Sequence, residues 1–342
     1  MKLKAKDIAK KLSISPSAVS FALNNKPGVS EETRRKILKV IEQMGYNTNN
    51  ILSKSALTHN RNIQFIIYKK HGLVVSDTPF FSALIEGIDR EARSLGYNLI
   101  VTYMDENKDN LMKILHIIER TSPDGIMLLA TEMTKKDLKP FKKLNIPLLL
   151  LDSYFESENL DTVIINNLEG AYKATCYLFE LGHRDIGYLH SSVWINNFDH
   201  RMAGFKKAIH NKGLKLKENL IFCLESTIDG SYKNMFNILE SKPKLPTALF
   251  ADNDIIAFGA IKAMKEFRIR IPQDVSVIGF DDMPFCEMID PPLTTVMVYK
   301  QRMGMIALKR LAERIKEAPA ETIKIEINTT LIKRKSVIKP YK

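Results

Sequence analysis

Cysteine is scarce in this sequence and long hydrophobic runs are missing. The 342 residues include only Cys176, Cys223 and Cys286, an odd number of widely spaced thiols that fits neither a disulfide framework nor a paired zinc site. We expect them to be buried thiols in a reducing cytoplasm. No apolar stretch approaches the roughly 20 residues that cross a bilayer, and the N-terminal MKLKAKDIAKKL lacks the apolar core of a secretory signal. These absences argue against a membrane protein and against an exported one.

Motifs that carry catalysis are missing as well. The chain has no GxGxxG or Walker-type phosphate loop, no HExxH, no CxxC and no GxSxG. Its seven histidines are scattered, and His183 is more simply a packing or helix-end residue than a ligand. We therefore expect no catalytic residue, no metal and no cofactor, and a protein that works by binding.

Positive charge is concentrated at the N-terminal end. The net charge of the chain is +12, and residues 1–60 hold eleven Lys and Arg against four Asp and Glu. A basic balance confined to one small segment favours a polyanion-binding module joined to a nearly neutral body. A basic tail that is merely solvated would show the same charge balance. The spacing of the apolar and capping residues has to distinguish a folded DNA-binding module from such a tail.

The basic segment is predicted to form three short helices. Residues 6–12 place their apolar side chains on one helical face. Ser15 caps a second helix, Pro16–Leu23, in which proline takes the first position. A third helix follows Ser30 and ends at Gly45. This is the geometry of a helix-turn-helix that docks its second helix in the major groove, although a generic three-helix cap would be patterned similarly.

Residues 7–46, DIAKKLSISPSAVSFALNNKPGVSEETRRKILKVIEQMGY, closely resemble the signature of the lactose-repressor (LacI/GalR) family. The resemblance implies a sequence-specific transcriptional regulator, most simply a repressor, with a DNA-binding domain at 1–47 and a double-stranded DNA operator as partner. It implies that the base-facing residues are Pro16, Ser17 and Phe21, and that Ser15, Ser20, Asn24 and Ser30 contact or orient phosphates.

Phe21 departs from the pattern of the family. Many members have arginine at this position, and arginine can read guanine with two hydrogen bonds. Phe21 would offer apolar contact, for instance with a thymine methyl group, or would pack inward. The operator sequence therefore stays open.

The hinge, residues 48–60, also departs from that pattern. In the family this stretch forms a short helix on DNA, and a leucine from each protomer wedges into the minor groove. The matching position here is Ser55, so the resemblance leaves Leu52 or Leu57 as the wedge. A plain flexible tether is the alternative.

From residue 61 onward, short apolar runs alternate with amphipathic helical segments. Continuous apolar strands separated by helices indicate α/β units with parallel sheets that are covered on both faces. Two such units in series leave a cleft at the carboxyl ends of the strands, where ligands usually bind. The strand candidates are 63–68, 97–103, 125–130, 147–152, 162–166, 186–190, 247–251 and 275–279, and the helices include 81–95, 168–181, 200–212 and 254–267.

The resemblance extends along this body, through runs such as ELGHRDIGYLHS and ADNDIIAFGAIKAM. It implies a periplasmic-binding-protein-like effector domain at 61–342, made of two doubly wound parallel-sheet subdomains that are joined by three crossings. We expect their limits near 61–160 plus 292–324, and 161–291 plus 325–342. It also implies a homodimer whose two heads read the two halves of a pseudo-palindromic operator.

Polar side chains follow several of the predicted strands, at the ends where a ligand would lie. By resemblance, Asp152, Arg201, Asn253 and Asp281 contact an effector, and Phe80 and Phe81 flank the cleft mouth. Helix caps and core packing are the alternatives. Trp194 and Phe198 are candidates for an aromatic surface on which a sugar stacks. We expect the effector to be a sugar or sugar derivative. A sugar-binding protein or sugar-acting enzyme with an accessory helical bundle is the competing hypothesis.

Overall fold

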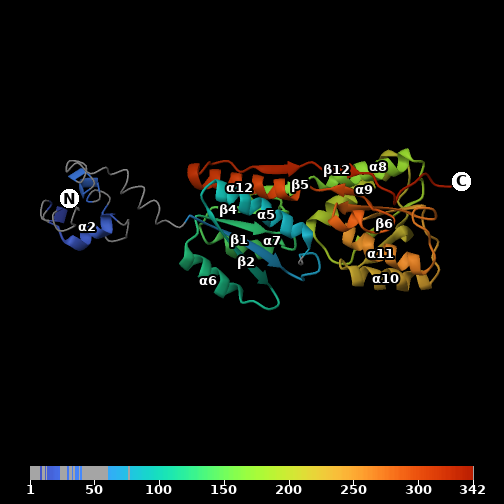
Figure 1. The fold of residues 1–342 in the computed structure, drawn as a ribbon, viewed down its shortest axis with the longest axis horizontal. Coiled ribbons are helices and arrows are strands. Elements are labelled where there is room, and N and C mark those ends of the chain that lie inside the picture. The colour runs from blue at the N-terminus through green and yellow to red at the C-terminus, as the bar shows by residue number, and fades with distance from the viewer. Residues whose placement is uncertain are drawn as a thin grey trace. The chain divides into compact units, whose positions relative to one another are not determined.

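The computed structural model describes residues 8, 9, 12, 14–23, 29, 30, 33, 35–37, 39, 40, 61–75 and 78–341 (Figure 1). The chain divides into two compact units, Met1–Arg61 and Asn62–Lys342. Asn24, Leu52 and Leu57, three of the residues that we expect at the DNA, lie outside the described residues.

The first unit contains a small apolar core beneath helix α2 (Pro16–Leu23). Val19, on the inner face of α2, is fully buried against Ile8, Ala9 and Ile37. The backbone N–H of Ile14 donates to the carbonyl of Ala9 at 3.1 Å, which fixes the turn that precedes α2. The small side chain of Ala9 at this contact allows two short helices to cross closely.

Both predicted helix caps are present in this unit. Ser15 Oγ accepts a hydrogen bond from the backbone N–H of Ala18 at 3.1 Å, and Ser30 Oγ accepts one from the N–H of Thr33 at 3.2 Å. Each serine satisfies an N–H group that the first turn of a helix leaves unpaired. The caps thus set where these helices begin.

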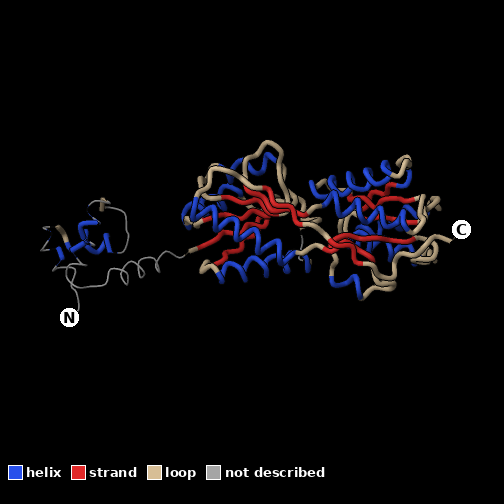
Figure 2. Tube along the Cα trace, turned by 90° about the horizontal axis from the view of Figure 1, so that it is seen from above, coloured by secondary structure: helices blue, strands red, loops and turns tan. Residues whose placement is uncertain are grey.

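The second unit has two lobes, each built on a six-stranded sheet (Figures 1 and 2). In the first sheet all neighbouring strands are parallel, in the order β11 (Lys324–Ile327), β5 (Asp161–Ile165), β4 (Leu148–Leu151), β3 (Gly125–Leu129), β1 (Asn62–Lys69) and β2 (Asn98–Asp105). The second sheet is parallel except at its first pair, in the order β12 (Thr330–Ile332), β10 (Thr294–Met297), β9 (Ser276–Asp281), β8 (Ala248–Ala251), β6 (Ile186–Ser191) and β7 (Ile221–Leu224).

Helices cover both faces of the first sheet because its strands are apolar on both sides. Along β1, Phe65 and Ile67 pack with helix α5 (Pro79–Ser94), whereas Ile66 and Tyr68 belong to the separate cluster that holds α6 (Leu111–Thr121) and α7 (Lys135–Lys142). This alternation follows from the two-residue period of a strand. Helix α12 (Lys300–Glu317) packs against α5.

In the second lobe, α8 (Asn167–Glu180) packs against α9 (Asn196–Asn211), and α10 (Ile228–Glu240) against α11 (Asp254–Glu266). Two short 3-10 helices, Glu218–Leu220 and Pro284–Glu287, lie in connections. A Cβ at Gly204 would lie 2.1 Å from the carbonyl oxygen of Leu168. Only glycine therefore lets α8 and α9 approach so closely.

The chain passes between the lobes three times, after β5, after β10 and after β11. The predicted limits of the lobes are wrong at these passages. Strand β5 belongs to the first sheet, because it pairs with β4 (Leu149 with Asp161). Strand β10 belongs to the second sheet, where Thr294 pairs with Ile278, and β11 belongs to the first.

The expectations about membrane-spanning segments and about the cysteines have different outcomes in the fold. Within the described part of the chain, no helix is both long and apolar enough to span a bilayer. All three cysteines are free, but only Cys286 is buried, whereas Cys176 is half-buried and Cys223 is exposed. The expectation of buried thiols is therefore wrong for Cys223, which lies on β7 at the edge of its sheet.

Candidate ligand-binding site

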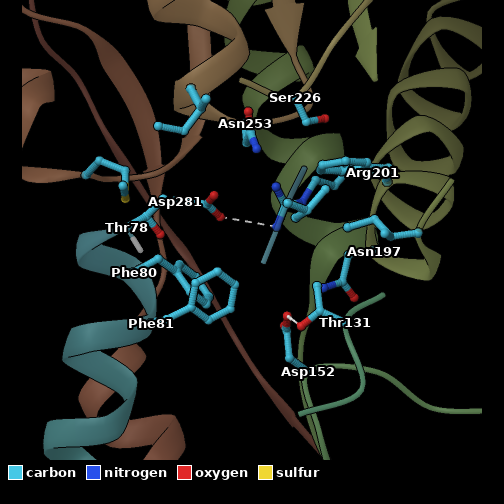
Figure 3. Close-up of a pocket in the computed structure, with 15 residues that line it drawn as sticks. Thr78, Phe80, Phe81, Thr131, Asp152, Asn197, Arg201, Ser226, Asn253 and Asp281 are labelled. Atoms are coloured by element: carbon cyan, nitrogen blue, oxygen red, sulfur yellow. Dashed lines mark hydrogen bonds and ion pairs between the residues drawn. The ribbon is translucent and has the colours of Figure 1, made fainter. Parts of the chain in front are cut away.

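A cavity opens at the carboxyl ends of the strands, between the two lobes of the second unit (Figure 3). The first lobe contributes the segments that follow β1, β3 and β4, and the second lobe those that follow β6, β7, β8 and β9. The lining residues are Val74, Thr78, Phe80, Phe81, Thr131 and Asp152 from the first lobe, and Ile195, Asn197, Phe198, Arg201, Ser226, Asn253, Ile255, Asp281 and Met283 from the second.

Arg201 is held in place by three hydrogen bonds and by contact with an aromatic ring. Its Nε donates to Asn167 Oδ1 at 2.8 Å, its Nη1 to the carbonyl oxygen of Asp252 at 2.5 Å, and its Nη2 to Asp281 Oδ1 at 3.2 Å. The guanidinium carbon lies 3.7 Å from the centre of the Phe280 ring. Only 3% of Arg201 is exposed, so this network fixes the guanidinium as part of the pocket wall.

Asp152 is buried at the end of β4 and has unused hydrogen-bonding capacity. Its Oδ2 accepts from Thr131 Oγ1 at 2.7 Å, whereas its Oδ1 is buried without a hydrogen-bond partner. Burial, assisted by the charge of Asp281, raises the pKa of Asp152 to about 6, although the Thr131 hydrogen bond, the charge of Arg201 and the nearby Asn197 amide oppose that shift. A carboxylate oxygen left unpaired inside a cavity is an acceptor for a bound molecule.

Asn253 and Asp281 show that capping and lining the pocket are compatible. Asn253 Oδ1 accepts from the N–H of Ile256 at 2.9 Å and so caps α11, while its amide nitrogen is turned toward the cavity (Figure 3). Asp281 is paired with Arg201, and burial raises its pKa. Its backbone has a φ of 112°, a region that residues other than glycine rarely occupy.

Asp254 is a buried structural neighbour of the pocket. It does not line the cavity but accepts hydrogen bonds from Thr295 Oγ1 at 2.5 Å and from the N–H of Met283 at 2.8 Å. Burial, followed by the charge of Asp281, raises its pKa to about 7. Asp254 therefore holds the segment that brings Met283 into the pocket wall.

Aromatic rings form the apolar side of the cavity. Phe80 and Phe81 meet edge to face with ring centroids 5.0 Å apart, and Phe198 packs beside the Arg201 guanidinium. The structure does not bring Trp194 to this surface. That side chain is 51% exposed and donates from its indole N–H to Asp199 Oδ2 at 2.6 Å, so the assignment of Trp194 to the pocket is wrong.

Sequence reasoning missed several lining residues. Thr131 follows β3 by two residues and Ser226 follows β7 by two, positions that strand-end reasoning can identify. Ser226 was missed because β7, an edge strand that is only partly buried, was not among the predicted strands. Asn197 gives no local signal, since it reaches the cavity only because α9 begins there.

A second buried carboxylate anchors the loop that leads to Phe80. Glu132 accepts hydrogen bonds from the backbone N–H groups of residues 70, 71, 72, 74 and 75, at 2.8 to 3.0 Å. Burial alone would raise the pKa of Glu132, but hydrogen bonds from His71 and from these N–H groups outweigh it and lower the pKa to about 2. Val74, which lines the cavity, lies inside this loop.

The first unit presents the candidate DNA contacts at its surface. Phe21 is 39% exposed and does not pack fully inward, and the other candidates that the structure describes are exposed too: Ser15, Pro16, Ser17, Ser20 and Ser30. No group of three His, Cys, Asp or Glu side chains suited to a metal ion occurs in the described ranges.

A helical unit with an exposed, capped second helix, followed by a two-lobed α/β unit with a polar cavity, defines a class of protein: regulators that combine a DNA-binding head with a ligand-binding body. Comparisons agree with this class. Residues 4–49 match the family described as bacterial regulatory proteins, lacI family, and residues 175–337 match the periplasmic binding protein-like domain.

Relatives extend the match over nearly the whole chain. HTH-type transcriptional repressor PurR of Actinobacillus pleuropneumoniae serotype 3 (strain JL03) is 30% identical over 334 residues, 97% of each chain. PurR of Erwinia tasmaniensis is 32% identical over 340 residues, 98% of each. The chain belongs to the lacI family of bacterial regulatory proteins and is a DNA-binding transcriptional regulator.

Solved structures share the fold. The transcriptional regulator CelR in complex with cellobiose has a TM-score of 0.74 at 22% identity, and the match covers 98% of this chain and 100% of that one. A LacI family transcriptional regulator from Enterococcus faecium with bound ribose has a TM-score of 0.70 at 26% identity, over 81% of this chain and 99% of that one.

Proposed function

We propose that this regulator acts in the cytoplasm as a repressor whose affinity for a DNA operator is set by a small ligand in the cavity between the two lobes. The ligand is a sugar or a sugar derivative, and it contacts Asp152, Arg201, Asn253 and Asp281 with Phe80, Phe81 and Phe198 on its apolar side. The observation that carries the proposal is that the buried, unpaired Asp152 Oδ1 lines the same cavity as the fixed Arg201 guanidinium.

The chemistry of the lining supports a polyhydroxylated ligand. Carboxylate, amide and hydroxyl groups converge on one cavity that also has aromatic faces, and sugars present both hydroxyls and apolar C–H faces. The Enterococcus faecium structure with bound ribose, at 26% identity, is consistent with this ligand class. A ligand that touches both lobes stabilises one arrangement of them over others, and such differential affinity suffices to couple the cavity to DNA binding.

We further propose that the ligand-binding body forms a homodimer, so that two heads read the two halves of an operator. The first lobe exposes large apolar side chains on two consecutive elements: Val101 and Tyr103 on the edge strand β2, and Met112 and Ile117 on α6. Apolar groups gathered on one side of a lobe are typical of an interface.

The first prediction is that DNA binding requires the first unit. We expect the full chain to enrich a specific sequence from a random duplex library, and a chain of residues 61–342 to retain no duplex at the same protein concentration. The reason is that the candidate base and phosphate contacts all lie within residues 1–60. Equal retention by the shortened chain in a gel-shift assay would contradict the assignment of DNA binding to the head.

A second prediction concerns base readout by α2. We expect Phe21→Arg to change the preferred base at one operator position by about tenfold or more, because arginine adds two hydrogen bonds to guanine. Lys39→Ala, which removes an exposed cation from the same unit, should instead weaken binding to all duplexes about equally and reduce its salt dependence. Repeating the library selection with each variant measures both. An unchanged preference in Phe21→Arg would remove Phe21 from the base contacts.

A further inference from the structure

The charge of the cavity lining is unbalanced toward negative. Among the lining residues that the structure describes, three are charged, namely Asp152, Asp281 and Arg201, and the other twelve are uncharged. Asp281 and Arg201 form an ion pair at 3.2 Å. The remaining charge is therefore that of Asp152, whose free Oδ1 has no hydrogen-bond partner.

Arg201 is poorly placed to receive an anionic ligand. Its three nitrogen atoms all donate to protein acceptors, and one face of the guanidinium is covered by the ring of Phe280. An anion would have to replace Asp281 as the ion-pair partner and would leave that carboxylate unpaired. Such an exchange gains no net ion pair and leaves an uncompensated buried charge.

Lys300 is a nearby cation that could balance the charge of an anionic ligand, but its ammonium group is already hydrogen-bonded to the backbone. Its Nζ donates to the backbone carbonyl oxygens of Asp281 and of Asp282, the latter at 3.0 Å, and it lies 5.7 Å from the centre of the Phe80 ring. Lys300 does not line the cavity. Its charge faces the backbone behind Asp281 and not the place where a ligand would lie.

We propose that the cavity selects its effector by charge, and accepts an uncharged or positively charged compound that places a hydroxyl or amino donor on Asp152 Oδ1. Phosphorylated and carboxylated compounds are rejected, because their charge would lie beside an unpaired carboxylate in a site of low dielectric. This inference rests on the proposed function, since it names the chemical class of the ligand for the same cavity.

The first arm of the test needs no ligand. We compare the thermal unfolding of the full-length chain with that of Asp152→Asn, and with Asp229→Asn as a control that removes one exposed carboxylate from α10. At pH 7.5 we expect Asp152→Asn to melt roughly 2–5 °C above the wild type, because the wild type then holds an unpaired charge. The difference should vanish as the pH falls toward 4 and Asp152 becomes protonated. A lower melting temperature for Asp152→Asn at pH 7.5 would overturn the proposal.

The second arm uses compounds matched in shape and differing in charge: D-glucose, D-glucosamine and D-glucose 6-phosphate, then D-ribose and D-ribose 5-phosphate, then adenosine and adenosine monophosphate. Binding raises the melting temperature by mass action. In any set that binds, we expect the phosphorylated member to bind about 100-fold more weakly than its uncharged counterpart, and Asp152→Asn to reduce that ratio.

The outcomes separate the two proposals. A phosphorylated member that binds as tightly as its uncharged counterpart overturns the charge selection and leaves the ligand-binding function standing. If none of the compounds raises the melting temperature, the proposed sugar effector loses its support, whereas the comparison of Asp152→Asn with the wild type still decides the charge of the cavity.

Discussion

Replacement of Arg201 by alanine is expected to abolish the response of operator binding to the effector and to leave operator binding itself in place. Arg201 joins three segments of the second lobe, since it bonds Asn167, the carbonyl of Asp252 and Asp281. Without it, Asp281 is a buried carboxylate with no ion-pair partner, and the ligand loses the wall that orients it. We expect effector affinity to fall at least about 100-fold, which corresponds to about 2.7 kcal/mol of binding free energy.

The measurement is a gel-shift or anisotropy titration of the selected operator, with and without the compound that raises the melting temperature. Arg201→Lys is the informative companion variant. It keeps the charge but lacks the planar fork that serves three acceptors at once, so it should fold better than alanine and still respond weakly. Arg184→Ala, which removes an exposed arginine from the same lobe, is the control. A normal response in both Arg201 variants would exclude this residue from the pocket.

The parts of the fold that sequence reasoning predicted well are those governed by local chemistry. Ser15 and Ser30 are caps because a serine hydroxyl reaches an N–H three residues ahead, a contact that needs no tertiary structure. Strands such as β3 and β4 are visible because every residue in them is apolar and buried. By contrast, β10, β11 and β12 are short and mix polar with apolar residues, and only their pairing with distant strands defines them.

The predicted limits of the lobes are wrong because they, too, depend on pairing between segments that are distant in the sequence. Asp161 lies in the first lobe because it pairs with Leu149, and because its carboxylate accepts from Arg310 Nε at 2.9 Å and from the N–H of Ile323 at 2.8 Å. These partners lie about 150 residues away along the chain. A pattern of apolar residues contains no information about such a pairing.

The cavity could be predicted in part because several of its polar residues directly follow strands. Asp152, Asn253 and Asp281 each lie at or just beyond the end of a strand, and parallel strands bring their carboxyl ends to one edge. The placement of Trp194 in the cavity could not be judged from the sequence. Its indole N–H donates to Asp199, and this hydrogen bond holds the ring outside the cavity. Whether the Trp194 ring points into the cavity or away from it depends on the path of the chain before α9.

Glu132 could not be recognised in the sequence at all, because its partners are backbone groups some 60 residues earlier. Five N–H groups from one loop converge on this carboxylate, an arrangement that fixes the path from β1 to α5. Phe80 and Phe81 lie in the first turn of α5, a few residues further along the chain. Glu132 is therefore a positioning residue for the aromatic wall, although it does not line the cavity.

Replacement of Glu132 by glutamine is expected to destabilise the ligand-binding body by about 3 kcal/mol at neutral pH. The folded protein holds the pKa of Glu132 at about 2, against an ordinary value of 4.5, and each pKa unit corresponds to about 1.4 kcal/mol. A glutamine would turn an NH₂ group toward backbone N–H donors on one side.

Because the pKa of Glu132 is lower in the folded protein than in the unfolded chain, this stabilisation is present above about pH 4.5 and is lost as the pH falls toward 2. The melting temperature of Glu132→Gln should therefore lie roughly 5–10 °C below that of the wild type at pH 7, and the two should converge gradually as the pH falls from 4.5 toward 2. Glu119→Gln, at an exposed position on α6, should match the wild type throughout. A constant gap between Glu132→Gln and the wild type over this pH range would show that the charge of Glu132 does not anchor the loop.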